Sequence, residues 1–239
     1  NQLTQKDLII KYIIIGLVNF CASLAEKLTS QGNEVFGIDT RMNKVDALKE
    51  KVSHTICMDA TDEFTVSGLP LKDTDVVVVA IGEDQGANIM VTALLKNLEV
   101  KRLISRAINP LHEKVLMAIG VDEIVHPEEE TAERWAKKLC LAGVVNSFEL
   151  SDDYSIVEIN LPPEYEGKKL SEIGIRKKHN LLVLTTIKST QVKRSIGNSI
   201  KESKVQGVAE ADLVLEKNDI LVVYGANKDI QSMLKKKFN

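Results

Sequence analysis

The chain has 239 residues, of which 44% are hydrophobic, 27% charged and 4% aromatic, and its formal net charge at pH 7 is −3. This length suits one large domain or two modest ones, and the composition is that of an ordinary folded globular protein. The slightly acidic balance and the scarcity of aromatic rings argue against nucleic acid as a partner.

Three widely separated cysteines, Cys21, Cys57 and Cys140, lie in apolar contexts. They fit a reducing cytosol better than a disulfide framework. The most apolar windows, residues 8–18 and 76–81, fall short of the ~20 residues that span a bilayer, and the first residues lack the pattern of a signal peptide. We therefore expect a cytoplasmic protein, for which any membrane crossing is made by another chain.

Short aliphatic runs alternate with longer amphipathic stretches between Tyr12 and about Leu141. Runs this apolar suit parallel strands that are buried on both faces. The predicted strands cover residues 12–15, 35–38, 55–58, 76–80, 102–105 and 123–125. Strand and helix in alternation predict an α/β fold, a Rossmann-like doubly wound parallel sheet, over residues 11–141.

The character of the chain changes after Ala142. A polar break at residues 151–153 is followed by a predicted strand, a short helix, a second strand, a polar Ser/Lys-rich excursion, a third strand and a last helix. These elements cover residues 154–161, 171–178, 181–187, 220–224 and 228–237. We expect a tail at residues 1–10, a crossover or linker at 142–151 and a smaller α+β domain at 152–239. So small a domain often gains stability by dimerising.

The first predicted strand ends in Gly16-Leu17-Val18-Asn19-Phe20-Cys21 and runs directly into a helix. A dinucleotide fold places G-x-G-x-x-G here, with the phosphates over the helix N-terminus. Only Gly16 is present, because Val18 and Cys21 stand where the second and third glycines are expected. Taken alone, this motif is a weak signal.

Three further features lie at the carboxyl ends of predicted strands, the edge where open α/β sheets bind ligands. Asp39 closes the second strand at about the spacing expected of an acidic residue that binds ribose hydroxyls. Asp59-Ala60-Thr61 follows the third strand, and Ile81-Gly82 ends the fourth. Asp39 and Thr61 could instead cap the helices that follow them, and Gly82 could serve a turn. Because all of them share one edge, we predict a nucleotide-binding crevice.

Several of these segments resemble RCK (also called KTN) domains, the regulators of potassium conductance. They are Tyr-Ile-Ile-Ile-Gly-Leu-Val-Asn-Phe at 12–20, Phe-Gly-Ile-Asp at 36–39, Asp-Ala-Thr at 59–61, Val-Val-Ala-Ile-Gly at 78–82 and Ile-Val-His-Pro-Glu at 124–128. Residues 154–161, 170–178 and 220–225 resemble the smaller C-terminal companion domain. The resemblance covers nearly the whole chain from Tyr12, and it is greatest to the stand-alone cytosolic subunits of bacterial Trk/Ktr potassium uptake systems.

That resemblance implies a regulatory subunit and not an enzyme. Homodimers would assemble into an octameric ring of Rossmann lobes, docked on the inner face of the membrane under a membrane-embedded Trk/Ktr-type potassium transporter. An adenine nucleotide, ATP, ADP or NAD(H), would bind the lobes and change the shape of the ring, which opens or closes the pore.

The resemblance also assigns residues to the nucleotide. Gly16, Val18, Asn19 and Phe20 fall at the turn near the phosphates, and Asp39, Thr40 and Arg41 fall at the ribose. Asp59 and Ala60 fall by the adenine, Ile81 and Gly82 under the loop, and Arg106 and His112 toward the phosphates of a neighbouring site. Glu128 matches a carboxylate that holds a divalent cation, Mg²⁺ or Ca²⁺, between lobes.

One departure from the family pattern bears on the ligand. Uptake regulators usually have G-x-G-R-F-G, whose arginine reaches the terminal phosphates, whereas this chain has Asn19 at that position. Asn forfeits a charge-assisted contact worth ~1.5–3 kcal/mol. We therefore expect weakened discrimination between ATP and ADP, or a different adenine nucleotide.

Other constellations have simpler explanations. Tyr165 and Lys169 have the Tyr-x-x-x-Lys spacing of short-chain dehydrogenases but lie beyond the Rossmann segment, after two prolines. His54 and Cys57 have metal-like spacing but point to alternate sides of a strand, with no second pair nearby. Glu128 opens a helix, where a carboxylate faces the macrodipole favourably, and that does not exclude a cation there.

Alternatives remain for function and assembly. An NAD(H)-dependent oxidoreductase would need an acid–base pair beside the nicotinamide, and a redox-sensing repressor would need a DNA-reading helix. The apolar stretch 131–148, interpreted as helical, either crosses to a partner subunit or packs on its own lobe. Ile175, Arg176 and residues 181–184 either line a site for a second ligand, cyclic di-AMP in some relatives, or form a plain dimer core.

Overall fold

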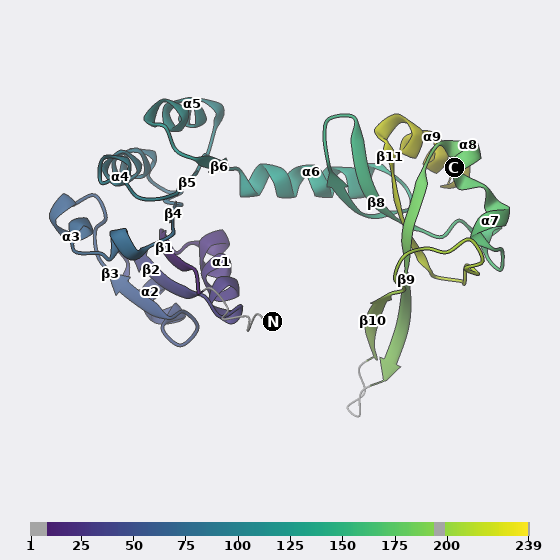
Figure 1. The fold of residues 1–239 in the computed structure, drawn as a ribbon, viewed down its shortest axis with the longest axis horizontal. Coiled ribbons are helices and arrows are strands. Elements are labelled where there is room, and N and C mark those ends of the chain that lie inside the picture. Colours follow the sequence, from purple (N-terminus) through teal and green to yellow (C-terminus); the bar gives the residue numbers. More distant parts are fainter. Residues whose placement is uncertain (1–8, 194–198, 239) are drawn as a thin grey trace, which may run out of the picture. The chain divides into compact units, whose positions relative to one another are not determined.

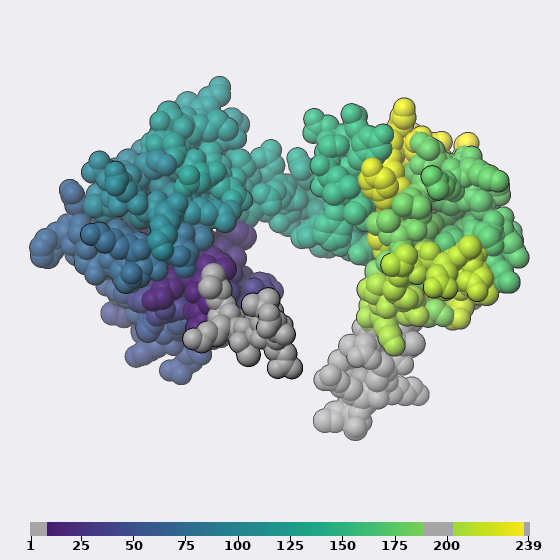
Figure 2. Space-filling view, in the orientation of Figure 1, coloured from purple at the N-terminus to yellow at the C-terminus, as the bar shows by residue number. Residues whose placement is uncertain are grey.

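The computed structural model describes residues 9–193 and 199–238, which form two compact units that divide between Glu128 and Glu129 (Figure 1). In each unit the side chains fill the spaces between the elements (Figure 2). Residues 1–8 of the expected N-terminal tail lie outside the described residues. The predicted domain boundary at residues 141 and 142 follows helix α6 (Pro127–Cys140), whereas the compact units divide within its first turn.

The first unit is built on a six-stranded parallel sheet in the order β3-β2-β1-β4-β5-β6. Its strands are β1 (Lys11–Ile15), β2 (Glu34–Asp39), β3 (His54–Cys57), β4 (Val76–Val79), β5 (Leu103–Arg106) and β6 (Glu123–Val125). Its helices are α1 (Asn19–Ser30), α2 (Met42–Leu48), α3 (Glu63–Ser67), the 3₁₀ helix η1 (Leu71–Asp73), α4 (Gln85–Asn97) and α5 (Pro110–Ile119). The Rossmann-like prediction is confirmed, with every predicted strand of this sheet present.

The sheet is buried on both faces, which explains why its strands are continuous aliphatic runs. Successive side chains of a strand point to opposite faces. Ile13 and Ile15 of β1 therefore pack in one apolar cluster with residues of α3 and α4, and Ile14 packs in the other with residues of α1 and α2. All three isoleucines are essentially inaccessible to solvent, and burial of each contributes ~1.5–3 kcal/mol.

The order of the strands creates a switch point in this sheet. The central strand β1 has β2 on one side and β4 on the other, so the chain leaves β1 first toward one edge and then returns toward the other. In open α/β sheets the connections at such a point diverge and leave a crevice at the carboxyl ends of the strands.

The second unit is built on a five-stranded antiparallel sheet in the order β10-β9-β11-β8-β7. Its strands are β7 (Val144–Glu149), β8 (Tyr154–Asn160), β9 (Leu182–Lys193), β10 (Ser199–Val205) and β11 (Ile220–Ala226). Its further elements are η2 (Pro163–Tyr165), α7 (Leu170–Ile173), α8 (Ile175–His179) and α9 (Asn227–Phe238). Ile159, Leu221 and Val223 of the sheet pack with Met233 of α9 in a single core, as expected of a small α+β domain.

Three sequence-based expectations for this unit are wrong in detail. The predicted helical stretch 131–148 ends as a helix at Cys140, because β7 occupies much of the range expected to be a linker and pairs with β8. The polar excursion contains strand β10, which pairs with β9. The predicted helix 171–178 is two short helices, because Gly174 takes a left-handed conformation at φ +62° between them.

Within residues 9–193 and 199–238, no helix combines the length and the apolar character needed to cross a bilayer.

Candidate functional site

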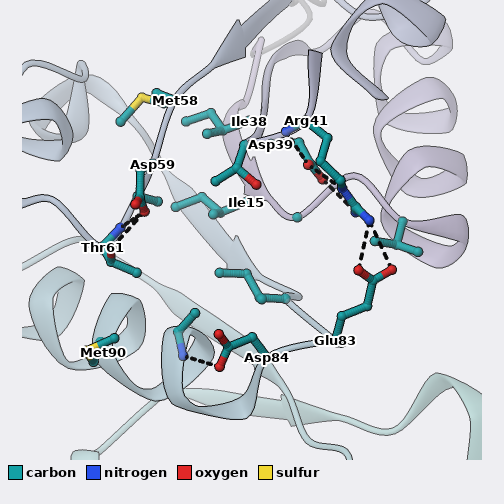
Figure 3. Close-up of a pocket in the computed structure, with 17 residues that line it drawn as sticks. Ile15, Ile38, Asp39, Arg41, Met58, Asp59, Thr61, Glu83, Asp84 and Met90 are labelled. Atoms are coloured by element: carbon teal, nitrogen blue, oxygen red, sulfur yellow. Dashed lines mark hydrogen bonds and ion pairs between the residues drawn. The ribbon is translucent and has the colours of Figure 1, made fainter. Parts of the chain in front are cut away.

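A cavity of about 370 Å³ opens at the carboxyl ends of strands β1 to β4, beside the switch point (Figure 3). Residues from the four strand ends and from the start of α4 line it. They are Ile15, Gly16, Val18, Ile38, Asp39, Thr40, Arg41, Met58, Asp59, Ala60, Thr61, Ile81, Gly82, Glu83, Asp84, Ala87 and Met90. We call this cavity the crevice.

Most of the residues assigned to the nucleotide from the sequence line the crevice. These are Gly16, Val18, Asp39, Thr40, Arg41, Asp59, Ala60, Ile81 and Gly82. Asn19, Phe20, Arg106 and His112 do not line it, and neither does Glu128. Sequence reasoning missed Glu83 and Asp84, although their position directly after Ile81-Gly82 was a usable signal.

Gly16 is required by the close approach of two strand ends. Its φ is +95°, and a Cβ atom at this position would lie 2.9 Å from the Ile81 nitrogen and 3.0 Å from the carbonyl group of Ala80. The Gly16 N–H donates to the Ile38 carbonyl at 2.8 Å. The turn after β1 is therefore held tightly against the ends of both β2 and β4.

Helix α1 begins at the crevice without a side-chain cap. Val18 occupies the N-cap position in an extended conformation and makes no side-chain cap bond, and the first turn contains no acidic residue. Asn19, the first helical residue, has a positive φ of 24°. Uncapped N–H groups and the positive end of the helix dipole favour an anion such as phosphate. Asn19 brings no charge to this position.

Asp39 is 5% exposed and ties the turn after β1 to the end of β2. Its Oδ2 accepts from the Leu17 N–H at 2.8 Å, and its Oδ1 accepts from the Arg41 N–H at 2.9 Å. Burial alone would raise the pKa of this carboxyl, but hydrogen bonds from Arg41 and Leu17 and the Arg41 charge hold the pKa below its ordinary value. The alternative in which Asp39 caps α2 is wrong, because the N-cap residue Arg41 has no side-chain cap bond and Asp39 binds elsewhere.

Arg41 crosses from one lip of the crevice to the other (Figure 3). Its Nε donates to Asp39 Oδ1 at 3.0 Å, and its Nη1 donates to both carboxylate oxygens of Glu83 at 2.8 and 3.0 Å. The two carboxylates raise the pKa of the guanidinium, so Arg41 stays charged. Of the residues that line the crevice, Arg41 is the one with a positive charge, against four carboxylates at Asp39, Asp59, Glu83 and Asp84.

Asp59 folds the loop after β3 onto itself. Its Oδ1 accepts from the Thr61 N–H at 2.9 Å and from the Thr61 hydroxyl at 2.7 Å, and these bonds lower the pKa of the carboxyl. The next helix, α3, is capped by Asp62, which accepts from the Phe64 N–H at 3.0 Å. The alternative in which Thr61 caps that helix is therefore wrong.

A buried polar network fixes the backbone at the end of β4. The Asn88 side chain is fully buried and donates to the Ile81 carbonyl at 3.1 Å. The Ser105 hydroxyl donates to Asn88 Oδ1 at 3.2 Å and lies 3.2 Å from the Thr92 hydroxyl. Because each of these groups is paired inside the fold, the peptide that forms the crevice floor is held in one position.

Arg106 and Glu128 lie beside the crevice. Arg106 Nη2 pairs with Glu128 Oε1 at 2.8 Å, and the guanidinium packs against Gly82, where a Cβ atom would collide with it. Glycine at position 82 is therefore needed for the contact with Arg106, and not only for a turn. Burial raises the pKa of the Cys21 thiol on α1 to about 12. The nearby Arg106 charge lowers this pKa and the Glu128 charge raises it, but both effects are smaller than that of burial.

His112 is enclosed within the first unit, and its role toward the phosphates of a neighbouring site stays a prediction. His112 is 2% exposed, neither ring nitrogen has a hydrogen-bond partner among the described residues, and burial lowers its pKa. The imidazole is thus neutral and enclosed in the first unit, so an approach to the phosphates of a neighbouring site would require it to move.

The residues with metal-like spacing in the sequence have other partners in the fold. Among the described residues, no three His, Cys, Asp or Glu side chains gather to hold a metal ion, and a divalent cation at Glu128 stays a prediction. His54 pairs with Glu34 at 3.3 Å, while the Cys57 thiol donates to the Thr40 carbonyl. Tyr165 ends η2 in the second unit, whereas the crevice is formed by residues of the first.

Comparison with known proteins gives consistent matches. The model of the TrkA-N domain family matches residues 12–127. Ktr system potassium uptake protein C of Bacillus subtilis is 35% identical, over 95% of this chain and 96% of that protein. Ktr system potassium uptake protein A of the same organism is 31% identical, over 92% of this chain and 94% of that protein.

Solved structures share the fold at lower identity. The crystal structure of the GsuK RCK domain has a TM-score of 0.65 at 17% identity, covering 98% of this chain and 49% of that chain. The GsuK channel bound to NAD has a TM-score of 0.63 at 17% identity, covering 98% of this chain and 40% of that chain. This chain thus spans about half or less of the length of those structures, and the likeness concerns the fold.

Proposed function

This chain belongs to the family of Ktr potassium uptake proteins that carry a TrkA-N domain, and on that premise we propose that it is a regulatory subunit. In this proposal the subunit binds an adenine nucleotide in the crevice and gates a membrane-embedded potassium transporter. The observation that carries the proposal is the crevice itself, where Gly16, Asp39 and the uncapped start of α1 converge at the switch point of a parallel sheet. The names of its relatives, which are potassium uptake proteins, indicate potassium uptake as the process that the subunit regulates.

The mechanism that we propose is a population shift. A nucleotide favours one arrangement of an assembled ring, an octamer on the inner face of the membrane, to the extent of its differential affinity for the two arrangements. Thermodynamic linkage is reciprocal. If nucleotide changes the affinity of the ring for the open transporter by some factor, the open transporter must change the affinity of the ring for nucleotide by the same factor.

The function is tested by measuring potassium flux into liposomes that contain the membrane partner of this uptake system. We expect flux to depend on the added chain and to differ between ATP, ADP, NADH and AMP at saturating concentrations. Mass spectrometry of the denatured chain would identify any nucleotide that copurifies. Flux that is unaffected by the chain, with or without nucleotide, would reject the regulatory function.

Asn19 predicts weak discrimination between ATP and ADP. Because no arginine stands at this position, calorimetric titration should give ATP and ADP affinities within about tenfold of each other. Asn19→Arg should strengthen ATP relative to ADP by about tenfold or more, the equivalent of one charge-assisted contact. A strong ATP preference of the unaltered chain would contradict this prediction.

We also propose that α6 and β7 join two copies of the chain. Among its described residues α6 has none that is buried, and Trp135, Leu139 and Phe148 are 50%, 77% and 50% exposed. Apolar side chains left exposed in series are typical of a protein interface. Light scattering at micromolar concentration should therefore show a dimer or a larger assembly, and a monomer would exclude the crossover.

We further propose that the second unit binds a second ligand. A cavity of about 380 Å³ is lined by Ile175, Arg176 and Leu181 together with residues of α7 and the loop before α8. Arg176 provides a charge for a phosphodiester such as cyclic di-AMP, whereas the alternative is that a second copy fills the cavity. Titration of the full chain with cyclic di-AMP distinguishes the two, because a filled cavity would give no heat of binding.

The oxidoreductase alternative has gained no observation in its favour. The relatives with more than 30% identity are named as potassium uptake proteins. A substrate-dependent change in NADH absorbance would revive this alternative.

A further inference from the structure

The Arg41 guanidinium is held between two carboxylates, those of Asp39 and Glu83, and both line the crevice (Figure 3). On the loop after β2 it pairs with Asp39, through Nε to Oδ1 at 3.0 Å and through Nη2 to Oδ2 at 3.4 Å. On the opposite lip, before α4, its Nη1 pairs with both oxygens of Glu83 at 2.8 and 3.0 Å. We call the Arg41–Glu83 pair the latch.

The hydrogen bonds of Asp39 leave no acceptor position free. An ionised carboxylate offers about four lone-pair sites. Oδ1 accepts from the Arg41 N–H and from Arg41 Nε, and Oδ2 accepts from the Leu17 N–H and from Arg41 Nη2. The two backbone donors belong to the turns that form the crevice. The two side-chain donors of Arg41 are therefore the ones that a ligand can replace.

A ribose with free 2′- and 3′-hydroxyls brings two neighbouring donors, the number that Arg41 occupies. We propose that Arg41, anchored by Glu83, competes with the ribose diol for Asp39 and thereby sets the affinity of the crevice for ribonucleosides. This inference rests on the proposed nucleotide site, since it concerns the same Asp39. When a ribonucleoside binds, Arg41 gives up its side-chain bonds to Asp39 and the latch opens or moves aside.

The latch also makes the affinity sensitive to salt. Glu83 is 68% exposed and Arg41 is 37% exposed, so dissolved ions screen their attraction. Adenosine carries no charge, so salt acts on its binding mainly through charges of the protein. Adenosine should therefore bind more tightly to the unaltered chain as ionic strength rises, and this dependence should disappear when Arg41 is removed.

The test compares adenosine with 2′,3′-dideoxyadenosine, which lacks both hydroxyls, in calorimetric titrations of the full chain. Arg41→Ala should bind adenosine about tenfold more tightly, the equivalent of one charge-assisted hydrogen bond, with little change for the dideoxy compound. Glu83→Gln should give a gain of about two- to fivefold, as expected of an exposed ion pair. The double variant should match Arg41→Ala, because Glu83 acts through Arg41.

Glu123→Gln is the matched control. It opens a comparable exposed pair, Arg102–Glu123, at the opposite end of the sheet from the crevice, and should leave adenosine affinity unchanged. Weaker adenosine binding by Arg41→Ala would make Arg41 a ligand contact and overturn the latch. Equal binding by Glu83→Gln and the unaltered chain would also overturn it, and this surface substitution tests the latch even if Arg41→Ala does not fold. Failure of every variant to bind adenosine, ADP or NADH would instead overturn the nucleotide site itself.

Discussion

Replacing Gly16 by alanine should destabilise the first unit by about 2–6 kcal/mol and abolish nucleotide binding. A positive φ of 95° costs a residue with a Cβ atom about 1–3 kcal/mol. The added methyl group would also lie 2.9 Å from the Ile81 nitrogen, so backbone must shift, and the cost of such overpacking is about 1–3 kcal/mol. The loss is a large part of the ~5–15 kcal/mol that holds a typical domain together.

Gly32 provides the matched control for this prediction. It has a similar φ of +88°, but a Cβ atom there would meet nothing within 4 Å. Gly32→Ala should therefore show the backbone cost alone, about 1–3 kcal/mol, and should keep nucleotide binding. Urea denaturation of the two variants separates the two contributions. Equal destabilisation by both substitutions would mean that the contact with the end of β4 does not matter.

Replacing Asp39 by asparagine should weaken nucleotide binding by at least tenfold and destabilise the fold by about 1–3 kcal/mol. An amide at this position turns one acceptor into a donor, so it cannot accept from both Leu17 and Arg41 as the carboxylate does. The same change removes the charge that we expect to bind the ribose hydroxyls. Calorimetric titration and denaturation of the same samples measure both effects.

Asp75→Asn is the control for the binding part of this prediction. The Asp75 carboxylate also accepts a backbone N–H, from Lys11 at 3.0 Å, but it lies at the amino ends of the strands. This variant should lose some stability and bind nucleotide normally. Loss of binding in both variants would show that weakened binding reports destabilisation and not the ribose contact.

The stabilising effect of Asp39 should depend on pH in one direction. Its pKa in the folded state lies below the ordinary value of 3.8, so the unfolded chain takes up the proton first as pH falls. The contribution is therefore complete well above pH 3.8 and decreases as pH falls through the folded-state pKa. The difference in unfolding free energy between the unaltered chain and Asp39→Asn should be constant near neutral pH and shrink below about pH 4. A difference that grows on acidification would contradict the assignment.

The sequence alone determined the parallel sheet and the edge at which the crevice lies. Runs such as 12–15 and 76–80 are aliphatic throughout, and a strand this apolar must be buried on both faces. Each run is followed by helical periodicity, so the carboxyl ends of all the strands meet at one edge of the sheet. The sequence was enough to assign four residues that line the crevice to this edge: Gly16, Asp39, Asp59 and Gly82. Local pattern suffices here, because burial and alternation are properties of neighbouring residues.

Only the tertiary structure decided how distant residues pair. Strand β7 has weak local signal and exists through its pairing with β8, and the polar strand β10 exists through its pairing with β9. The burial of His112 and the latch between Arg41 and Glu83, 42 residues apart, likewise left no mark in the sequence. Ladder hydrogen bonds, ion pairs and enclosure depend on where distant segments meet, and periodicity along the chain carries no record of those meetings.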